Sequence, residues 1–303
     1  MFCKHEKRKN ILKKDNFSLS ECLLCGLIFL EKENENIDLN IYKNYYKKET
    51  GKRFGAVAEL AVKAFRFLRA LKVFILKPKG KKIIDIGSGR GWMLYFLKKY
   101  FGYKTAIGTQ ISENAYEFSK EKLGLEIYNK DLLDLEFNVK FDAITLWHIL
   151  EHVPEPESYV EKLTGMIDDD GLLMIETPNF NSWSRILAKN RWLAMDPKHH
   201  TTFFTPDSLK SLLEKYNFKI KKIGTFSLEY SAFTSAQSII NLITGTDNYF
   251  FEWLQKKDFN LKIILHALLF TILFPVCFLA NLVLYFSKNG EVINVIAEKN
   301  EQQ

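Results

Sequence analysis

The sequence predicts an α/β protein built on a doubly wound, mostly parallel sheet. Short β-branched runs alternate with amphipathic stretches from Lys81 onward, a glycine-rich turn follows the first run, and two late runs have the composition of closing strands. This alternation is typical of βαβ units. A chain of 303 residues with 26% charged and 14% aromatic residues has enough material for a full core, which excludes a wholly disordered protein.

Each element is predicted from its local pattern. Apolar residues recur at helical spacing over residues 54–77, which predicts a long helix before the sheet. The predicted strands span residues 83–86, 105–109, 126–128, 141–146 and 172–177, and the predicted helices between them span residues 91–101, 113–123, 155–166 and 206–216. Residues 218–226 and 291–298 are expected to close the same sheet as two further strands.

We expect five parts in the chain. Residues 1–50 form a small ribbon-like extension, residues 51–80 a basic amphipathic helix and residues 81–230 the core domain. An apolar helical insertion occupies residues 231–290, and residues 291–303 supply the last strand and the tail. The first residues are charged and lack the apolar run of a secretory signal, so a cytoplasmic, thiol-reducing setting is the expectation.

The clearest chemical signal is the turn Asp85-Ile-Gly87-Ser-Gly89-Arg-Gly91, placed between the first strand of the sheet and the next helix. Glycines there let the backbone approach a ligand closely, and the helix behind them presents unpaired N–H groups. The spacing differs from the G-x-G-x-x-G of dinucleotide-binding folds. A carboxylate at Asp85 suits a ligand with a cationic amine better than a pyrophosphate, which it would repel.

With this turn the chain resembles the class I S-adenosylmethionine-dependent methyltransferases of the ubiquinone and sugar type, over roughly residues 80–230 and the last strand. The runs around Gln110, Asp131 and Trp147 carry the resemblance further. It implies a Rossmann-like methyltransferase sheet with S-adenosyl-L-methionine as the cofactor. The residues that it implies for cofactor binding are Asp85, Gly87, Gly89, Gly91, Gln110, Asp131, Leu132 and Trp147.

The resemblance also assigns parts of the cofactor to these residues. It places the glycine turn under the methionine part and Asp131 with Leu132 beside the adenine. The family usually has an acidic residue at the end of the second strand, which accepts hydrogen bonds from the ribose, and this chain has Gln110 there. An amide oxygen accepts without the assistance of a charge, so each of these bonds should be weaker.

Two histidine clusters indicate where a proton could be removed from an acceptor. His152 follows Glu151 after the fourth strand, and the stretch Asp196-Pro-Lys-His-His200 resembles a segment over the substrate pocket of polysaccharide-associated methyltransferases. We predict His200 as the general base, then His152, with Glu151 beside them. Alternatively, His152 braces its loop, or Glu151 and His152 hold a divalent cation, although His148 stands where a further carboxylate is needed.

The cysteines of the extension suggest a metal site. Cys22-Leu-Leu-Cys25 has the spacing of two thiolates on one zinc ion and resembles the second knuckle of a zinc ribbon. The first knuckle would be Cys3-Lys-His5, in which a single intervening residue makes it strained for both side chains to bind one ion. The predicted ligands are therefore Cys3, His5, Cys22 and Cys25, and the alternative is a metal-free remnant.

An apolar run and a basic segment point toward a membrane. Residues 263–287 contain no charged side chain, which makes them a candidate transmembrane helix, yet a single crossing would separate the last strand from its sheet. The run could dip into one leaflet, pair with residues 233–243 as a hairpin, or form a buried core or dimer helix. Residues 52–82 carry ten Lys and Arg against one Glu, like an interfacial helix that faces anionic lipid.

These features together predict a methyltransferase that acts, by O-methylation, on a sugar, polysaccharide precursor or lipid-linked acceptor at the cytoplasmic face of a membrane. Residues 52–82 have a net charge of +9, which exceeds the +7 of the whole chain, so the remaining residues are slightly acidic. The chain also lacks an Asn-Pro-Pro-Tyr type motif, so a nucleic-acid methyltransferase is the less favoured enzyme class. A membrane-associated cofactor-binding scaffold without activity is the alternative from another class, and Gln110 is its best argument.

Overall fold

The computed structural model describes residues 3–14, 17–31, 55–256 and 260–300. Its central sheet has the strand order β10-β11-β8-β7-β4-β5-β6. The strands of this sheet are β4 (Lys82–Ile86), β5 (Thr105–Thr109), β6 (Glu126–Tyr128), β7 (Phe141–Trp147), β8 (Ile167–Pro178), β10 (Phe218–Gly224) and β11 (Val292–Lys299). Strand β11 is antiparallel to both of its neighbours, whereas β4 to β8 run parallel. The predicted fold class is confirmed.

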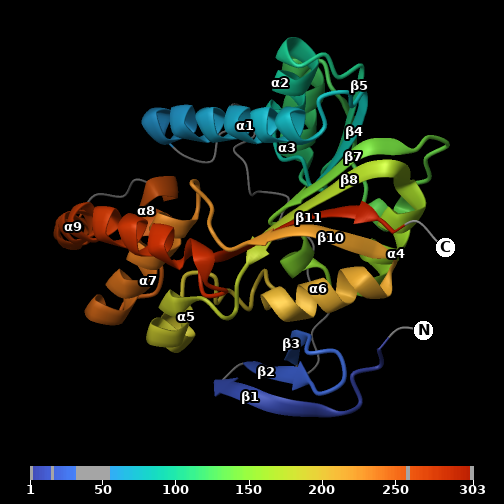
Figure 1. Ribbon diagram of the computed structural model, residues 1–303. Coiled ribbons are helices and arrows are strands. Elements are labelled where there is room, and N and C mark those ends of the chain that lie inside the picture. The colour runs from blue at the N-terminus through green and yellow to red at the C-terminus, as the bar shows by residue number, and fades with distance from the viewer. Residues whose placement is uncertain (1–2, 15–16, 32–54, 257–259, 301–303) are drawn as a thin grey trace.

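Helices cover both faces of this sheet (Figure 1). The helices α1 (Ala56–Leu76) and α2 (Trp92–Tyr100) lie on one face, and α4 (Pro156–Met166) and α6 (Pro206–Lys215) lie on the other. Side chains alternate along a strand, so Ile83 packs toward α1 and α2 while Ile84 packs toward α4 and α6. The predicted helix at residues 113–123 is α3 (Glu113–Glu117), continued by a π-helical turn over Phe118–Lys122.

The N-terminal extension forms a second, antiparallel sheet. It contains β1 (Arg8–Lys14), β2 (Phe17–Cys22), β3 (Ile28–Glu31) and the short β9 (Thr202–Phe203), in that order. In Figure 1 its first three strands lie below α6. A small core holds this sheet against the main domain, and its buried residues are Leu19, Ile28, Phe180, Ala188, Trp192, Met195 and Phe203.

The insertion before the last strand is helical. The helices α7 (Ser231–Thr244), α8 (Tyr249–Lys256) and α9 (Leu261–Val283) follow one another, and α7 packs along α9. The structure therefore has the hairpin arrangement among the three that the sequence left open. Leu261–Phe286 is the one segment of the described chain long and apolar enough to cross a membrane. Because β11 pairs with β8 directly afterwards, the end of this segment lies beside the central sheet.

The basic helix α1 differs from its sequence-based interpretation. Arg66 and Arg69 point into the protein, where both contact Glu229 at 2.7–2.8 Å. Phe67 packs edge-on against Phe96, and Phe74 stacks on Phe101. The expectation that Arg66 and Arg69 face anionic lipid is wrong, because both pair with the internal carboxylate of Glu229 instead.

A buried carboxyl group anchors the insertion to the sheet domain. Glu291 stands just before β11 and is 1% exposed. It accepts hydrogen bonds from Ser184 (2.7 Å) after β8 and from Ser235 (2.9 Å) on α7, and Ser235 in turn accepts from Asn281 of α9. Burial raises the pKa of Glu291 to about 7, although the hydrogen bonds from Ser184 and Ser235 oppose this shift.

The pKa of Glu291 predicts a loss of stability with rising pH. The unfolded chain releases this proton near its ordinary pKa of 4.5, whereas the folded chain keeps it up to about pH 7, so the contribution is fully present below pH 4.5 and is lost as the pH rises through 7. Glu291→Gln should remove about 3 kcal/mol of this pH dependence between pH 4.5 and 8, measured by urea unfolding. The control is Glu298→Gln, which lies on β11 and pairs with Lys221. An unchanged pH slope in Glu291→Gln would contradict the assignment.

Candidate active site

The glycine turn has the backbone that its sequence predicts. Gly87, Gly89 and Gly91 have φ values of 69°, 56° and 70°, in the left-handed region that favours glycine. A Cβ atom added at Gly87 would lie 2.0 Å from the Cδ1 atom of Ile149, which follows β7. The loop after β7 therefore lies directly on the turn after β4, at the carboxyl edge where a doubly wound sheet binds its ligands.

Asp85 lies beneath this turn as a buried acid. Its carboxyl group is 3% exposed, and its Oδ1 atom accepts a hydrogen bond of 2.6 Å from the hydroxyl group of Thr145 on β7. Burial raises the pKa of Asp85 to about 6, and the hydrogen bond from Thr145 opposes the shift. A cationic group nearby would favour the ionised form of this carboxyl group.

The residues predicted for the ribose and adenine have partners within the protein. The Oε1 atom of Gln110 accepts from the backbone N–H of Ser112 at 2.9 Å, which leaves one lone pair on that oxygen. Asp131 caps a short helix by accepting from the N–H of Leu133 at 2.9 Å and also accepts from the hydroxyl group of Tyr159. Leu132 is fully buried, and its side chain packs in the main hydrophobic core.

Trp147 ends β7 beneath two cations of α1. The guanidinium group of Arg69 lies 4.6 Å from the indole ring, and the ammonium group of Lys72 lies 5.3 Å from it. The indole N–H of Trp147 is buried and has no acceptor among the described residues. The glycine cradle, the buried acid and this indole N–H together fit a cofactor with a cationic amine and several hydrogen-bonding groups.

His148 is held between two buried carboxylates. Its Nδ1 atom lies 3.2 Å from Oε1 of Glu151, and its Nε2 atom lies 3.1 Å from Oε1 of Glu176 at the end of β8. Burial alone would lower the pKa of His148, but the hydrogen bonds to both carboxylates raise it to about 10. Burial would likewise raise the pKa values of the two glutamates, yet the hydrogen bond from His148 lowers each to about 2. The three groups are therefore ionised at neutral pH.

This charged cluster extends to the first helix through residues that the sequence analysis missed. Arg69 lies 3.4 Å from Glu176 and 2.8 Å from Glu229, and Glu229 also binds Arg66. Neither Glu176 nor Glu229 is among the site residues predicted from the sequence. Glu176 could have been predicted from its place near the end of β8, the strand next to β7. The carboxyl ends of parallel strands meet at one edge of the sheet, which here is the edge of the glycine turn.

His152 and His200 come together from distant parts of the chain. Their ring centroids lie 4.8 Å apart. Each Nδ1 atom lies near a carbonyl oxygen, 2.9 Å from that of His199 for His152 and 2.8 Å from that of Ala194 for His200. A carbonyl only accepts, so Nδ1 donates in both rings and Nε2 carries the lone pair. Burial lowers the pKa of His152 to about 4, which keeps this ring neutral at neutral pH.

The predicted catalytic set thus forms one group in space. Ligand atoms of Glu151, His152 and His200 lie within 4.8 Å of one another, which also suits a divalent cation. Glu151 differs from a simple base, because its carboxylate also accepts from Thr177 at 3.0 Å besides pairing with His148. The neighbouring His199 is directed elsewhere, with its Nδ1 atom 2.6 Å from a carboxylate oxygen of Asp196.

The four predicted metal ligands of the extension also meet. Ligand atoms of Cys3, His5, Cys22 and Cys25 all lie within 4.8 Å of one another. The single residue between Cys3 and His5 does not keep the two side chains apart, because His5 adopts a left-handed backbone conformation with φ of 51°.

The strand order, the antiparallel β11 and the glycine turn define a class I S-adenosylmethionine-dependent methyltransferase fold. A family profile described as "Methyltransferase domain" matches residues 60–223, more than half of the chain. The chain therefore belongs to this methyltransferase family.

Curated relatives and a solved structure agree with this family. A mitochondrial ubiquinone biosynthesis O-methyltransferase of Dictyostelium discoideum is 26% identical over 215 residues, which cover 64% of this chain and 61% of that protein. A ubiquinone biosynthesis O-methyltransferase of Coxiella burnetii is 34% identical over 110 residues, 34% of this chain and 46% of the relative. The match thus spans about half to three fifths of these relatives.

A similar fold occurs in the O-methyltransferase of a trans-AT PKS multienzyme of Brevibacillus brevis, crystallised with S-adenosyl-L-homocysteine. It has a TM-score of 0.51 and 15% identity, over 80% of this chain and 76% of that one. At this identity the likeness shows the fold alone.

Replacing His148 should destabilise the protein. His148→Gln removes the cation between Glu151 and Glu176 and leaves Glu151 without a positively charged partner of its own among the described residues, so the free energy of unfolding at pH 7 should fall by about 3 kcal/mol in urea unfolding. In the wild type the contribution of His148 is fully present below pH 6.5 and is lost as the pH rises through about 10. His199→Gln removes a ring that pairs at the surface and should cost little. Equal stability of His148→Gln and wild type at pH 7 would refute the ion cluster.

Proposed function

We propose that the protein transfers a methyl group from S-adenosyl-L-methionine to an oxygen atom of a small-molecule acceptor that is carried by a membrane lipid. The observation that supports this proposal most is that two groups of residues lie next to each other at one edge of the sheet. The glycine turn with the buried Asp85 touches Ile149, and the same loop continues into Glu151 and His152, which meet His200. A cofactor cradle and a proton acceptor thus share one loop.

The proposed roles of the residues follow from their atoms. When bound at the glycine turn, the cofactor would supply an electrophilic methyl group. The acceptor oxygen would attack the methyl carbon in line with the C–S bond, and S-adenosyl-L-homocysteine would leave as the thioether. The Nε2 atom of His200 takes the proton of the acceptor hydroxyl group, since Nδ1 already donates to the carbonyl of Ala194. The negative charge of Glu151 nearby favours the imidazolium that results. Asp85 would accept a hydrogen bond from the cationic amine of the bound cofactor.

The comparisons support oxygen as the methylated atom, because the curated relatives are named as O-methyltransferases of ubiquinone biosynthesis. A lipid-linked acceptor agrees with those names and with the apolar insertion, and a lipid-linked sugar would fit the same site.

A zinc ion bound by Cys3, His5, Cys22 and Cys25 would be structural in this scheme. It takes no part in the transfer.

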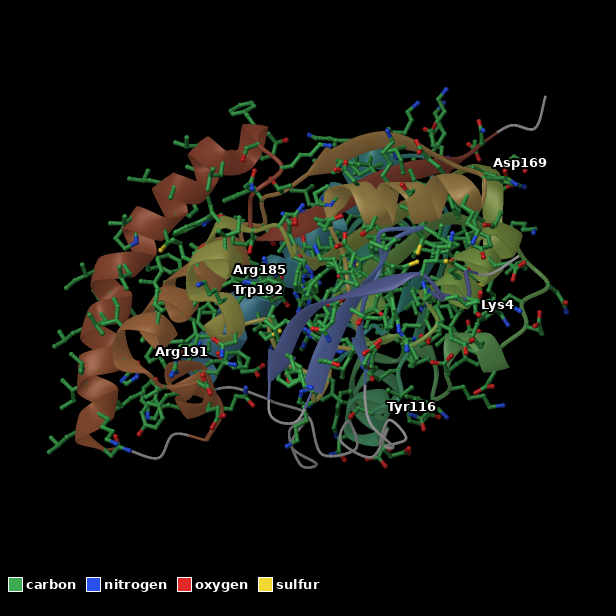
Figure 2. The ribbon with its side chains drawn as sticks, turned by 90° about the horizontal axis from the view of Figure 1, so that it is seen from below. Lys4, Tyr116, Asp169, Arg185, Arg191 and Trp192 are labelled. Carbon is green, nitrogen blue, oxygen red and sulfur yellow. The ribbon has the colours of Figure 1, made fainter. Side chains whose placement is uncertain are left out.

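Helix α9 supports a membrane surface because its exposed side is more apolar than its buried side. The buried side carries the polar residues His266 and Asn281 together with Ile263 and Cys277. The outward side is apolar, and its exposed side chains are Leu261, Ile264, Leu265, Leu268, Ile272, Phe274, Val276, Leu279, Leu282 and Val283. Figure 2 shows α9 along the left margin with its side chains pointing away from the protein. Polar groups inside and apolar groups outside are what a lipid solvent favours.

The insertion also leaves the sheet at the edge that carries the site. The register pairs Val292, the first residue of β11, with Pro178, the last residue of β8, and Gly224 at the end of β10 pairs with Asn294. Both ends of the insertion thus lie beside the carboxyl ends of the parallel strands. We place the protein at the cytoplasmic face, with α9 lying in one leaflet and the site open to an acceptor held there.

The base is tested with His200→Gln. Transfer should fall by about a hundredfold or more, because proton removal is lost. Affinity for S-adenosyl-L-homocysteine, measured by calorimetry, should stay within about twofold, because His200 lies on the acceptor side. The probe is tritiated methyl transfer from S-adenosyl-L-methionine into vesicles made from the total lipid extract of the source cells, with the water-soluble glycan fraction as a second acceptor pool.

His199→Gln is the matched control for this experiment, since its side chain pairs with Asp196 and not with the base. It should retain transfer. No binding of S-adenosyl-L-homocysteine by the wild type at millimolar concentration overturns the enzyme proposal. Tight binding without any transfer favours the scaffold, for which the partly occupied oxygen of Gln110 is the supporting observation.

The membrane contact is tested with Leu268→Asp combined with Ile272→Asp on the outward side of α9. Binding to vesicles of phosphatidylcholine and phosphatidylglycerol should fall by about tenfold or more, because each side chain loses roughly 2 kcal/mol of apolar burial. Val139→Asp, on the exposed loop before β7, is the control and should bind like the wild type. Unchanged binding of the double variant, or a wild-type dimer in light scattering that the double variant abolishes, contradicts lipid as the partner.

A further inference from the structure

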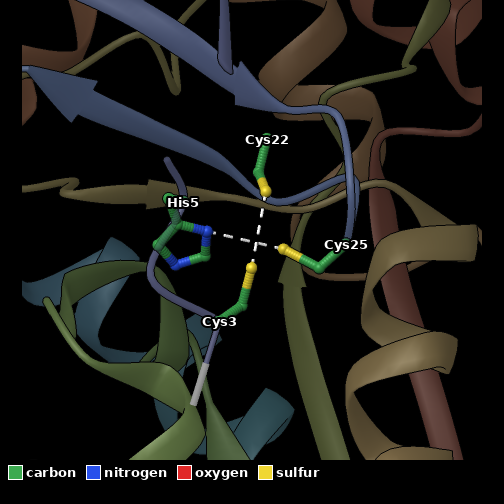
Figure 3. Close-up of side chains that lie close together, drawn as sticks. All are labelled: Cys3, His5, Cys22 and Cys25. Atoms are coloured by element: carbon green, nitrogen blue, oxygen red, sulfur yellow. Dashed lines mark hydrogen bonds between the residues drawn. The ribbon is translucent and has the colours of Figure 1, made fainter. Parts of the chain in front are cut away.

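The extension brings three thiol groups and one imidazole ring together, and their side chains point toward one another (Figure 3). The Sγ atoms of Cys3 and Cys22 lie 3.5 Å apart, and the Sγ atom of Cys25 lies 3.5 Å from Nδ1 of His5. Zinc–ligand bonds of about 2.3 Å to sulfur and about 2.0 Å to nitrogen give tetrahedral edges of about 3.8 Å and about 3.5 Å. These two opposite edges therefore have close to the lengths that a zinc ion requires.

The backbone around these ligands is a metal-binding knuckle. Gly26 follows Cys25 in the left-handed region, with φ of 71°, and its N–H donates to the carbonyl of Cys22 at 2.9 Å. The N–H of Cys22 donates to the carbonyl of Leu27 at 2.9 Å. The turn thus points both thiol groups of the C-x-x-C pair to one side. Four protein ligands leave no open position, which is the arrangement of a structural site.

We propose that Cys3, His5, Cys22 and Cys25 bind one zinc ion, and that the zinc-bound extension fixes the segment that carries His200. The connection is β3, which starts three residues after Cys25. Ile28 and Phe29 of β3 pair with Phe203 and Thr202 of β9, and the N–H of Leu30 donates to the carbonyl of Thr201 at 2.9 Å. The role assigned to His200 rests on the proposed function, whereas zinc binding does not.

The extension needs such support because it is small. It contains three strands and no helix in its described residues, and its core is shared with the segment that precedes His200. Sheets of this size are seldom stable without a metal ion or disulfides. Its other attachment also starts at a ligand, since the N–H of Cys3 donates to a carboxylate oxygen of Glu157 on α4 at 3.0 Å. One zinc ion would therefore connect the contact of Cys3 with α4 to the pairing of β3 with β9.

Zinc binding is tested on the full chain by inductively coupled plasma mass spectrometry. The wild type should carry close to one zinc per chain after purification, and Cys22→Ser combined with Cys25→Ser should carry less than about a tenth of that. Cys277→Ser removes a buried thiol of α9 and should keep the zinc. Absence of zinc from the wild type overturns the proposal, and so does a Cys3–Cys22 disulfide found by mass spectrometry under non-reducing conditions.

The link to His200 is tested on the wild type, so that an unfolded variant cannot confuse the result. Removal of zinc with a chelator should raise hydrogen exchange in residues 28–31 and 199–205 by about tenfold or more, and leave residues 82–100 unchanged. Affinity for S-adenosyl-L-homocysteine should persist while transfer falls, and added zinc should restore it. Zinc loss without a change in exchange at residues 199–205 overturns the link. If the zinc result stands but transfer is absent in the holoprotein, only the proposed function fails.

Discussion

A cluster of ionised side chains lies buried where β7 and β8 end, and the arrangement of the site depends on it. Charges in a protein interior are tolerated only when each has close partners. His148 bridges Glu151 and Glu176, and Arg69 joins Glu176 to Glu229. Because Arg69 belongs to α1, the same contacts that balance these charges hold this helix over Trp147. His148 also starts the loop that lies on Gly87 and continues to His152.

Elements with a local pattern could be predicted from the sequence, and partners across the fold could not. Each predicted strand is present, because alternation and β-branched runs are properties of neighbouring residues. The direction of Arg66 was predicted wrongly, since helical spacing shows a face but not what covers that face. Glu229 lies 163 residues away and is satisfied only in the folded chain. Likewise, the spacing of Cys3 and His5 suggested strain that the left-handed backbone of His5 removes.

The candidate site follows the same division. The glycine turn, Asp85 and the histidines were visible as motifs, and the structure brings His152 and His200 to a ring distance of 4.8 Å. The sequence did not show that the N–H of Ser112 donates to the side-chain oxygen of Gln110, or that Leu132 is buried. The first depends on local backbone geometry and the second on core packing. Motifs therefore predicted which residues the structure brings together, while the contacts of each side chain required the fold.

The segment that carries His200 is held by parts of the chain that are remote in sequence, which constrains how the site can work. The N–H of Thr201 donates to the carbonyl of Glu151 at 2.9 Å, and the carbonyl of Thr201 accepts from Leu30 of the extension. One residue thus connects the charged cluster on one side to the ribbon on the other. His200, the proposed base, immediately precedes this doubly bonded residue, so the position of its backbone depends on both bonds. The proposed function would therefore depend on the small added sheet as well as on the methyltransferase core.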